Sequence, residues 1–295
     1  MARALRILLA MAVALGATAV ACRGTSVGGA LRVVASMYPL AWAAQAAGGP
    51  RVQVEDLTPP GVEAHDTTLT ANERADLQTA DVVVLLGDLG FQPDIERAAR
   101  EASGTVVAVS QGMKLQPSEA HNLSFDPHVW LDPVLMEHVV TRVTDAFAAA
   151  DPEGTSGYER RAGAALAALR ALDAAYRDGL SGCGARTFVV THEAFGYLAA
   201  RYGLTQLGIE GLTPESEPSA AAIQVALDAI SSGEAAPAVF YEGTEEGRRI
   251  GESVAADAGV PALPMSTLEF APRSGDYRTV MRANLTTLRE GLRCR

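Results

Sequence analysis

Short apolar runs alternate along the chain with longer amphipathic segments. Eight runs rich in Val, Leu and Ile and bounded by Gly, Pro or Asp predict buried β-strands. They lie at residues 31–36, 52–57, 81–87, 105–109, 186–190, 205–210, 237–242 and 260–265. Helical patterns separate most of the runs, which is typical of parallel sheets with helices on both faces. Four runs precede a long gap and four follow it, so the pattern predicts an α/β fold of two doubly wound lobes, each with a mainly parallel four-stranded sheet.

The gap between the two sets of strands contains one helical pattern. From Tyr158 to Leu180 apolar residues recur every three or four positions, and charged residues such as Arg170 and Asp173 occupy the opposite face. The pattern predicts a helix of roughly 25 residues, about 40 Å long, that joins the lobes as a rigid strut. We expect three parts: an N-terminal lobe at 31–153, a linking helix at 154–182 and a C-terminal lobe at 183–295.

The first 21 residues differ from the rest of the chain. Two arginines precede an apolar run that ends in small residues at Ala21. A basic start, a short apolar stretch and a small-residue cleavage site are typical of a secretory signal, and the run is short for a membrane span. We expect a signal peptide at 1–21, a flexible tether at 22–30 and a mature protein outside the cytoplasmic membrane.

The three cysteines bear on the anchoring of the mature chain. The stretch Ala19-Val20-Ala21-Cys22 is similar to a bacterial lipobox, which predicts a lipid anchor at Cys22. Acylation there would leave Cys183 and Cys294 to pair as a disulfide in an oxidising compartment. Two alternatives stay open: cleavage without acylation, and unpaired thiols.

Composition narrows the possible partners. The sequence is 48% hydrophobic and 20% charged, as in a folded globular protein, and its formal net charge is −11. Removing residues 1–21 deletes two arginines and no acids, so −11 becomes −13. This acidity disfavours nucleic acid and favours cations. We expect a monomer with no nucleic-acid partner.

Three of the five histidines follow predicted strands. His65 comes after the strand at 52–57, His128 after that at 105–109, and His192 directly after that at 186–190. The carboxyl ends of parallel strands form the edge where α/β sheets bind ligands, so the three side chains can meet only between the lobes. Three imidazoles suit zinc. His121, on a loop, and His138, on a predicted helix, are weaker candidates.

The loop around His128 predicts a rigid ligand. In "DPHVWLDP", Asp132 and Pro133 read as the N-cap and first residue of a helix, and Trp130 is expected to pack beneath the loop. Asp126 or Asp132 could orient a ring nitrogen of His128. A ligand fixed in advance loses little freedom when it binds.

Five segments in order resemble one family. "GVEAHDTTLT", "DPHVWLDP", "THEAFGYLAARYGL", "GLTPESEPSAAAI" and "DYRTVMRANLTTLREGL" are similar to segments of the metal-specific solute-binding proteins of bacterial ABC importers, the zinc and manganese receptors. The resemblance runs from about residue 31 to the C-terminus. It implies two α/β lobes bridged by a long helix, metal in the cleft, and an ABC permease in the membrane as partner. It carries over His65, His128 and His192 as ligands, and a histidine at the third position favours zinc over manganese.

The fourth ligand departs from the family pattern. The resemblance implies an aspartate after the last strand, but this chain reads "ALPMSTLEF" there. Glu269 is the expected protein ligand, with Ser266 or water as alternatives. Glu210 and Glu242 also end predicted strands and are candidates for loop structure or for contacts with the ligands.

The sequence therefore predicts a high-affinity Zn²⁺ receptor that delivers its ion to an ABC permease and is not an enzyme. A metallochaperone is a further candidate partner. Neutral histidines as ligands predict that affinity falls as pH drops through imidazole titration near about 6.5. One alternative is a manganese receptor of the same family. Another is a secreted three-histidine zinc hydrolase, with Glu193 as a possible base, although we expect Glu193 in the first turn of a helix.

Overall fold

The computed structural model describes residues 29–118, 123–212 and 218–295. The predicted signal peptide, Cys22, most of the tether and His121 lie outside the described residues. None of the helices in the described ranges has the length and hydropathy required to cross a membrane.

The first lobe is built on a parallel sheet with strand order β2-β1-β3-β4. Its strands are β1 (Leu31–Ala35), β2 (Val52–Asp56), β3 (Val82–Leu85) and β4 (Thr105–Ala108). Helices α1 (Tyr38–Gly48) and α4 (Pro133–Ala150) pack on one face, and α2 (Ala71–Thr79) and α3 (Pro93–Ala99) cover the other. Short 3-10 turns lie at η1 (Gly49–Arg51), η2 (Ala64–Asp66), η3 (Val129–Leu131) and η4 (Pro152–Gly154).

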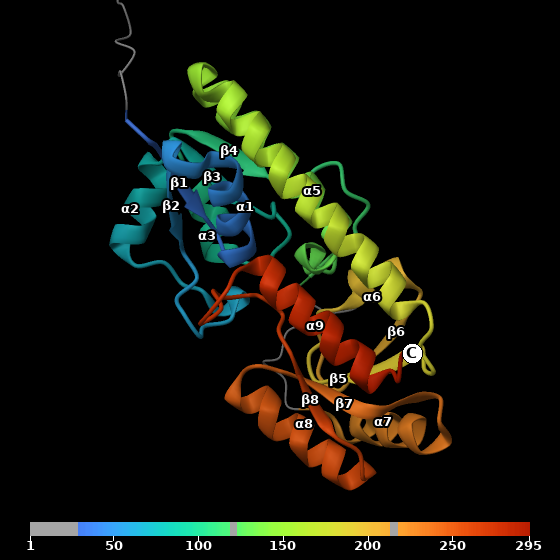
Figure 1. Cartoon of the computed structure of the whole chain (residues 1–295). Coiled ribbons are helices and arrows are strands. Elements are labelled where there is room, and N and C mark those ends of the chain that lie inside the picture. Colours follow the sequence, from blue (N-terminus) through green and yellow to red (C-terminus); the bar gives the residue numbers. More distant parts are fainter. Residues whose placement is uncertain (1–28, 119–122, 213–217) are drawn as a thin grey trace, which may run out of the picture.

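The second lobe repeats this architecture with a parallel sheet in the order β6-β5-β7-β8. Its strands are β5 (Thr187–Val190), β6 (Thr205–Gly208), β7 (Ala235–Glu242) and β8 (Ala262–Met265). Helices α7 (Ala220–Ser232) and α8 (Glu245–Ala258) cover the outer face, and α6 (Gly196–Tyr202) and α9 (Tyr277–Gly291) lie on the side facing the first lobe (Figure 1). All eight strands lie where the apolar runs predict them, and each strand end is within two residues of its predicted position.

The long helix α5 (Thr155–Leu180) links the lobes, as predicted, with 26 residues. It packs against α1 and α4 of the first lobe and against α6 and α9 of the second (Figure 1). Most of the predicted apolar stripe is buried. Asp173 is a correction: it was expected on the exposed face, but it is buried and accepts a hydrogen bond from Tyr202 Oη at 3.2 Å. The boundaries of the three parts of the chain stay predictions.

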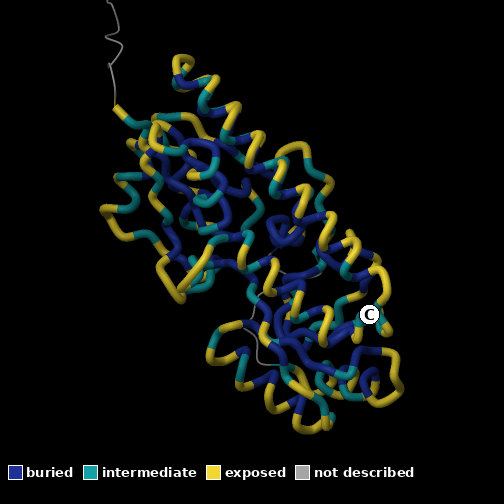
Figure 2. The backbone as a smooth tube through the Cα atoms, in the orientation of Figure 1, coloured by how far each residue is buried: buried dark blue, intermediate teal, exposed yellow. Residues whose placement is uncertain are grey.

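The apolar core is continuous across the two lobes. Buried residues from both sheets, from α5 and from α9 form one cluster (Figure 2). Each lobe also has one smaller core under its outer helices. Hydrogen bonds join the lobes as well: Trp130 Nε1 donates to Thr267 O at 2.6 Å, and Tyr197 Oη donates to Asp126 O at 2.8 Å. A core shared in this way favours a fixed arrangement of the lobes.

The C-terminus is tied to the end of α5. Cys183 and Cys294 form a disulfide across 111 residues of sequence, as predicted. Backbone hydrogen bonds from Gly184 and Ala185 to Leu292 O lie beside the bond.

Candidate metal centre

The loops at the carboxyl ends of three strands bring the histidines between the lobes. His65 lies in η2 after β2, His128 precedes η3 after β4, and His192 follows β5. The centroids of the His128 and His192 rings are 5.0 Å apart, although 64 residues separate them in sequence. His128 and Glu269 are 0% exposed and His192 is 1% exposed. The structure thus brings His128 and His192 together, whereas among the described residues no group of possible ligand atoms within 4.8 Å contains His65 with either of them.

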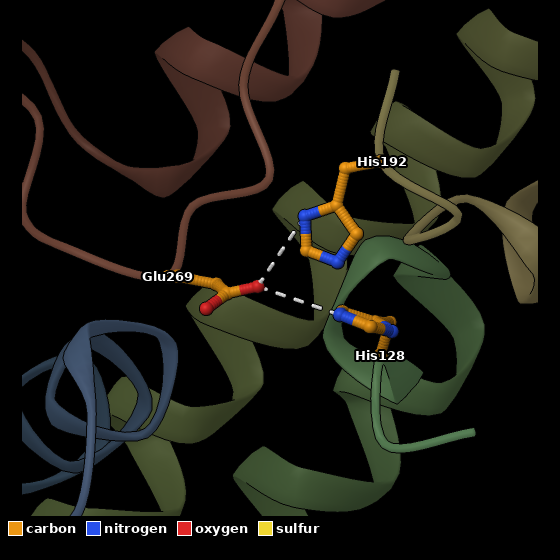
Figure 3. A group of neighbouring side chains, drawn as sticks. All are labelled: His128, His192 and Glu269. Carbon is orange, nitrogen blue, oxygen red and sulfur yellow. Dashed lines mark ion pairs between the residues drawn. The ribbon is translucent and has the colours of Figure 1, made fainter. Parts of the chain in front are cut away.

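A buried trio of possible ligands forms the deepest part of the site. Glu269 Oε1 lies 3.4 Å from His128 Nε2 and 4.0 Å from His192 Nδ1 (Figure 3). One ligand atom from each of the three residues lies within 4.8 Å of the others. Among the described residues, neither His128 Nε2 nor Glu269 Oε1 has a hydrogen-bond partner. Buried polar atoms without partners are rare, and two that face each other are suited to share a cation.

The orientation of His128 is fixed by Asp126. Asp126 Oδ1 accepts hydrogen bonds from the backbone N of His128 at 2.9 Å and from His128 Nδ1 at 2.8 Å. Asp132 instead caps α4, where Pro133 is the first residue, and pairs with Arg201 at 2.7 Å. A carboxylate on Nδ1 leaves Nε2 as the metal-binding nitrogen. Asp126 is therefore the residue that orients the ring.

His192 is held within the second lobe. Its Nδ1 lies 2.9 Å from Glu242 Oε2, and its Nε2 lies 3.2 Å from Leu212 O. The helix expected to hold Glu193 in its first turn begins only at Gly196, the first residue of α6. Glu193 is therefore not in a first helical turn, and its side chain lies against Gly208 of β6.

His65 lies on the side of the cluster that faces the cavity. Its Nε2 is 2.6 Å from Glu63 Oε2, and its Nδ1 is 3.2 Å from Asp66 Oδ1. With Glu63 and Glu269 it forms a second group whose ligand atoms lie within 4.8 Å. Glu269 therefore belongs both to the trio with His128 and His192 and to the group with His65.

Glu269, not Ser266, faces the histidines. The Ser266 hydroxyl accepts a hydrogen bond from Leu268 N at 3.2 Å within its own turn. Leu268 has a left-handed backbone with φ 60°, an unusual conformation for a residue with a branched side chain. The turn directs Glu269 into the cluster, where Glu269 Oε2 accepts from Ala64 N at 2.9 Å.

An acidic cavity lies beside the buried trio. It has a volume of about 400 Å³ and is lined by Glu63, His65 and Asp66 of the first lobe and by Glu210 and Glu242 of the second. Burial is the main cause that raises the pKa of Glu210 to about 7. The cavity connects the part of the site around His65 with solvent.

The carboxylates shift the titration of the histidines. Burial alone would lower the pKa of His65, but the Glu63 hydrogen bond and the negative charge of Glu269 outweigh it and raise the pKa to about 9. Burial would also lower the pKa of His192. The charge of Glu242 outweighs burial and raises this pKa to about 10. Burial would raise the pKa of Glu269, but the close contact with His128 and the charges of the histidines hold this pKa well below its usual range. The expectation of titration near 6.5 is thus corrected upwards, because these imidazoles lie among carboxylates.

The sequence analysis named Asp126 as one of two candidates to orient His128, but it missed the contacts of Glu63 and Thr267. Glu63 and Asp126 each lie two residues before the histidine that they contact. This Glu-x-His and Asp-x-His spacing is visible in the sequence. Thr267, which donates a hydrogen bond to Glu242, carries no such signal.

Comparisons with known proteins agree with this geometry. Residues 33–291 match the family model described as zinc-uptake complex component A, periplasmic (ZnuA). The zinc-binding protein AdcA of Streptococcus pyogenes serotype M18 is 30% identical over 88% of this chain, which spans 56% of that protein's length. The high-affinity zinc uptake system protein ZnuA of Bacillus subtilis is 29% identical, with 90% of this chain and 89% of that protein covered.

A solved structure has the same fold. The Zn(II)-bound ZnuA-like domain of AdcA from Streptococcus pneumoniae superposes with a TM-score of 0.77 at 29% identity, with 90% of this chain and 99% of that domain covered. The family match covers both lobes and the linking helix. The chain therefore belongs to the ZnuA family, the periplasmic A components of zinc-uptake complexes.

Proposed function

We propose that this protein is an extracytoplasmic receptor that binds Zn²⁺ with high affinity through His65, His128, His192 and Glu269 and delivers it to an ABC-type permease. The observation that carries the proposal is a pair of buried atoms, His128 Nε2 and Glu269 Oε1, which lie 3.4 Å apart and have no hydrogen-bond partner in the described part of the chain. The names of the relatives, which describe zinc binding and zinc uptake, support it.

The donor set favours zinc over manganese. Three imidazoles and one carboxylate suit a borderline ion, whereas manganese prefers sites rich in oxygen. The same set favours a receptor over a hydrolase. Glu269 supplies a fourth protein ligand, at the position that a catalytic zinc site keeps open for water.

Anchoring and delivery form a further part of the proposal. A zinc-binding lipoprotein, AdcA of Streptococcus pneumoniae serotype 4, is 30% identical over 89% of this chain, and this supports a lipid anchor at Cys22. In the proposed mechanism the monomer captures Zn²⁺ directly or from a metallochaperone. Docking on the permease then loosens the contacts of the second lobe, first those of His192.

Metal analysis of the purified mature protein tests this function. The wild type and His192→Ala are each incubated with equimolar zinc and manganese, desalted and analysed for bound metal. We expect about one zinc and little manganese per wild-type chain, and loss of most zinc from the variant. His138→Ala, which changes a histidine on α4 that contacts Gln111 O, is the matched control and should retain zinc. A wild type that retains manganese or no metal would refute the proposal.

A further inference from the structure

Thr267 lies where the three histidine-bearing segments meet. Its carbonyl accepts from Trp130 Nε1 at 2.6 Å, two residues beyond His128. Its hydroxyl donates to Glu242 Oε1, and the other oxygen of that carboxylate holds His192. Two residues further on, Glu269 accepts from Ala64 N, next to His65. Thr267 is 1% exposed, so water does not compete for its hydroxyl.

The Glu242 carboxylate is close enough to bind a cation. Ligand atoms of Glu63, His192 and Glu242 lie within 4.8 Å of one another. Both Glu242 oxygens are nevertheless engaged, Oε2 with His192 Nδ1 at 2.9 Å and Oε1 with Thr267. The backbone N of Glu242 also donates to Thr191 Oγ1 at 3.1 Å, which fixes the start of the side chain. A carboxylate held at both oxygens orients a histidine and is not free to turn to an ion.

We infer that Thr267 is a specificity-determining positioning residue, whose hydroxyl keeps Glu242 as the partner of His192 and out of the coordination sphere of the cation. This inference rests on the proposed zinc-binding function and deepens it. Without the hydroxyl, Glu242 Oε1 is an unpaired anionic oxygen in a buried site, and its simplest new partner is the bound ion. The donor set then gains an oxygen and His192 loses its orientation, and both changes favour manganese at the expense of zinc.

The test compares the affinities of three variants for Zn²⁺ and Mn²⁺, measured by competition with chelators of known affinity. Thr267→Val removes the hydroxyl at nearly constant volume, and Thr267→Ser restores it. Thr144→Val is the matched control, because Thr144 is also buried and donates to a carbonyl, Val140 O, within α4. Melting temperatures of the metal-free proteins report folding. Thr267→Ala replaces the valine variant if that protein does not fold.

We define the zinc preference as the ratio of the Mn²⁺ to the Zn²⁺ dissociation constant. Thr267→Val should lower this ratio by at least about tenfold, because changes in the residues that orient metal ligands have effects of this size. Thr267→Ser and Thr144→Val should keep the wild-type ratio. Adding Glu242→Gln to Thr267→Val removes the anionic oxygen and should abolish the gain in manganese binding.

Two results would overturn the inference. One is an unchanged ratio in Thr267→Val, including equal weakening for both ions, which would show a structural function alone. The other is a gain in manganese binding that persists in the double variant. Failure of the proposed function is distinguishable, because the wild type itself would then not prefer zinc.

Discussion

The inner and outer regions of the candidate metal centre differ in how firmly their proposed ligands are held. The inner region consists of His128, His192 and Glu269, which are at most 1% exposed. The outer region consists of Glu63, His65 and Asp66 beside the acidic cavity, where the Asp66 side chain is 51% exposed. The inner ligands come from both lobes, and the outer ones come from a single loop after β2.

The contrast suggests a division of tasks. In the inner region His128 Nε2 and Glu269 Oε1 have no hydrogen-bond partner in the described part of the chain, and Asp126 fixes the His128 ring, so little reorganisation of these two residues opposes capture. In the outer region Glu63 holds His65 Nε2 at 2.6 Å, and this contact must open before that nitrogen can bind an ion, while Asp66 Oδ1 lies 3.2 Å from His65 Nδ1. We therefore expect the inner region to set affinity and the outer region to control access.

The largest predicted effect separates the two regions directly. His128→Ala should weaken zinc binding by more than about 100-fold, beyond the range typical of outer contacts, because it removes a fully buried ligand. His65→Ala should weaken it by about tenfold, because Glu63 can supply an oxygen at the same place and the cavity can supply water. Chelator competition measures both affinities. Equal losses would show that the two regions do not differ.

A second prediction concerns protons. The pKa values of His65, about 9, and His192, about 10, lie above neutral, so the ion-free protein carries both protons at pH 7. Zinc must displace them, and affinity should rise about tenfold per pH unit for each displaced proton. The slope should fall near pH 9, where His65 loses its proton in the ion-free protein, and the rise should end above a pH of about 10, where His192 loses its proton.

Calorimetry in buffers of different ionisation enthalpy counts the released protons. His65→Ala should release one proton fewer than the wild type at pH 7. A binding enthalpy independent of the buffer would contradict the predicted protonation state.

The smallest effect compares two carboxylates that contact histidines. Asp126→Asn should weaken zinc binding by about 10- to 100-fold, because the buried partner of His128 Nδ1 loses its charge. Asp66→Asn should change the affinity by less than about threefold, because solvent screens an exposed pair. Melting curves of both variants check that the fold is intact. A larger effect of Asp66→Asn would place the decisive histidine in the outer region.

Local patterns predicted most of the fold. Apolar runs of five to seven residues predicted the eight strands, because central strands of a parallel sheet, such as β3, are covered on both faces and are therefore apolar. The three-to-four periodicity gave α5. The pattern misplaced Asp173, because Tyr202 approaches from α6, which is 29 residues away in sequence. The pattern also predicted too early a start for the helix after β5, because no sequence signal marks the turn between His192 and Gly196.

The sequence by itself determined two α/β lobes, a rigid linking helix and three histidines at strand ends, because these depend on periodicity and on topology. Only the tertiary structure placed Glu269, and not Ser266, beside the histidines, because the left-handed turn at Leu268 sets which side chain points inward. It also decided that Glu242 and Thr267 support His192, since that contact joins the ends of different strands. The titration of the histidines was likewise a tertiary property, because a pKa depends on charges close in space, whatever their separation along the chain.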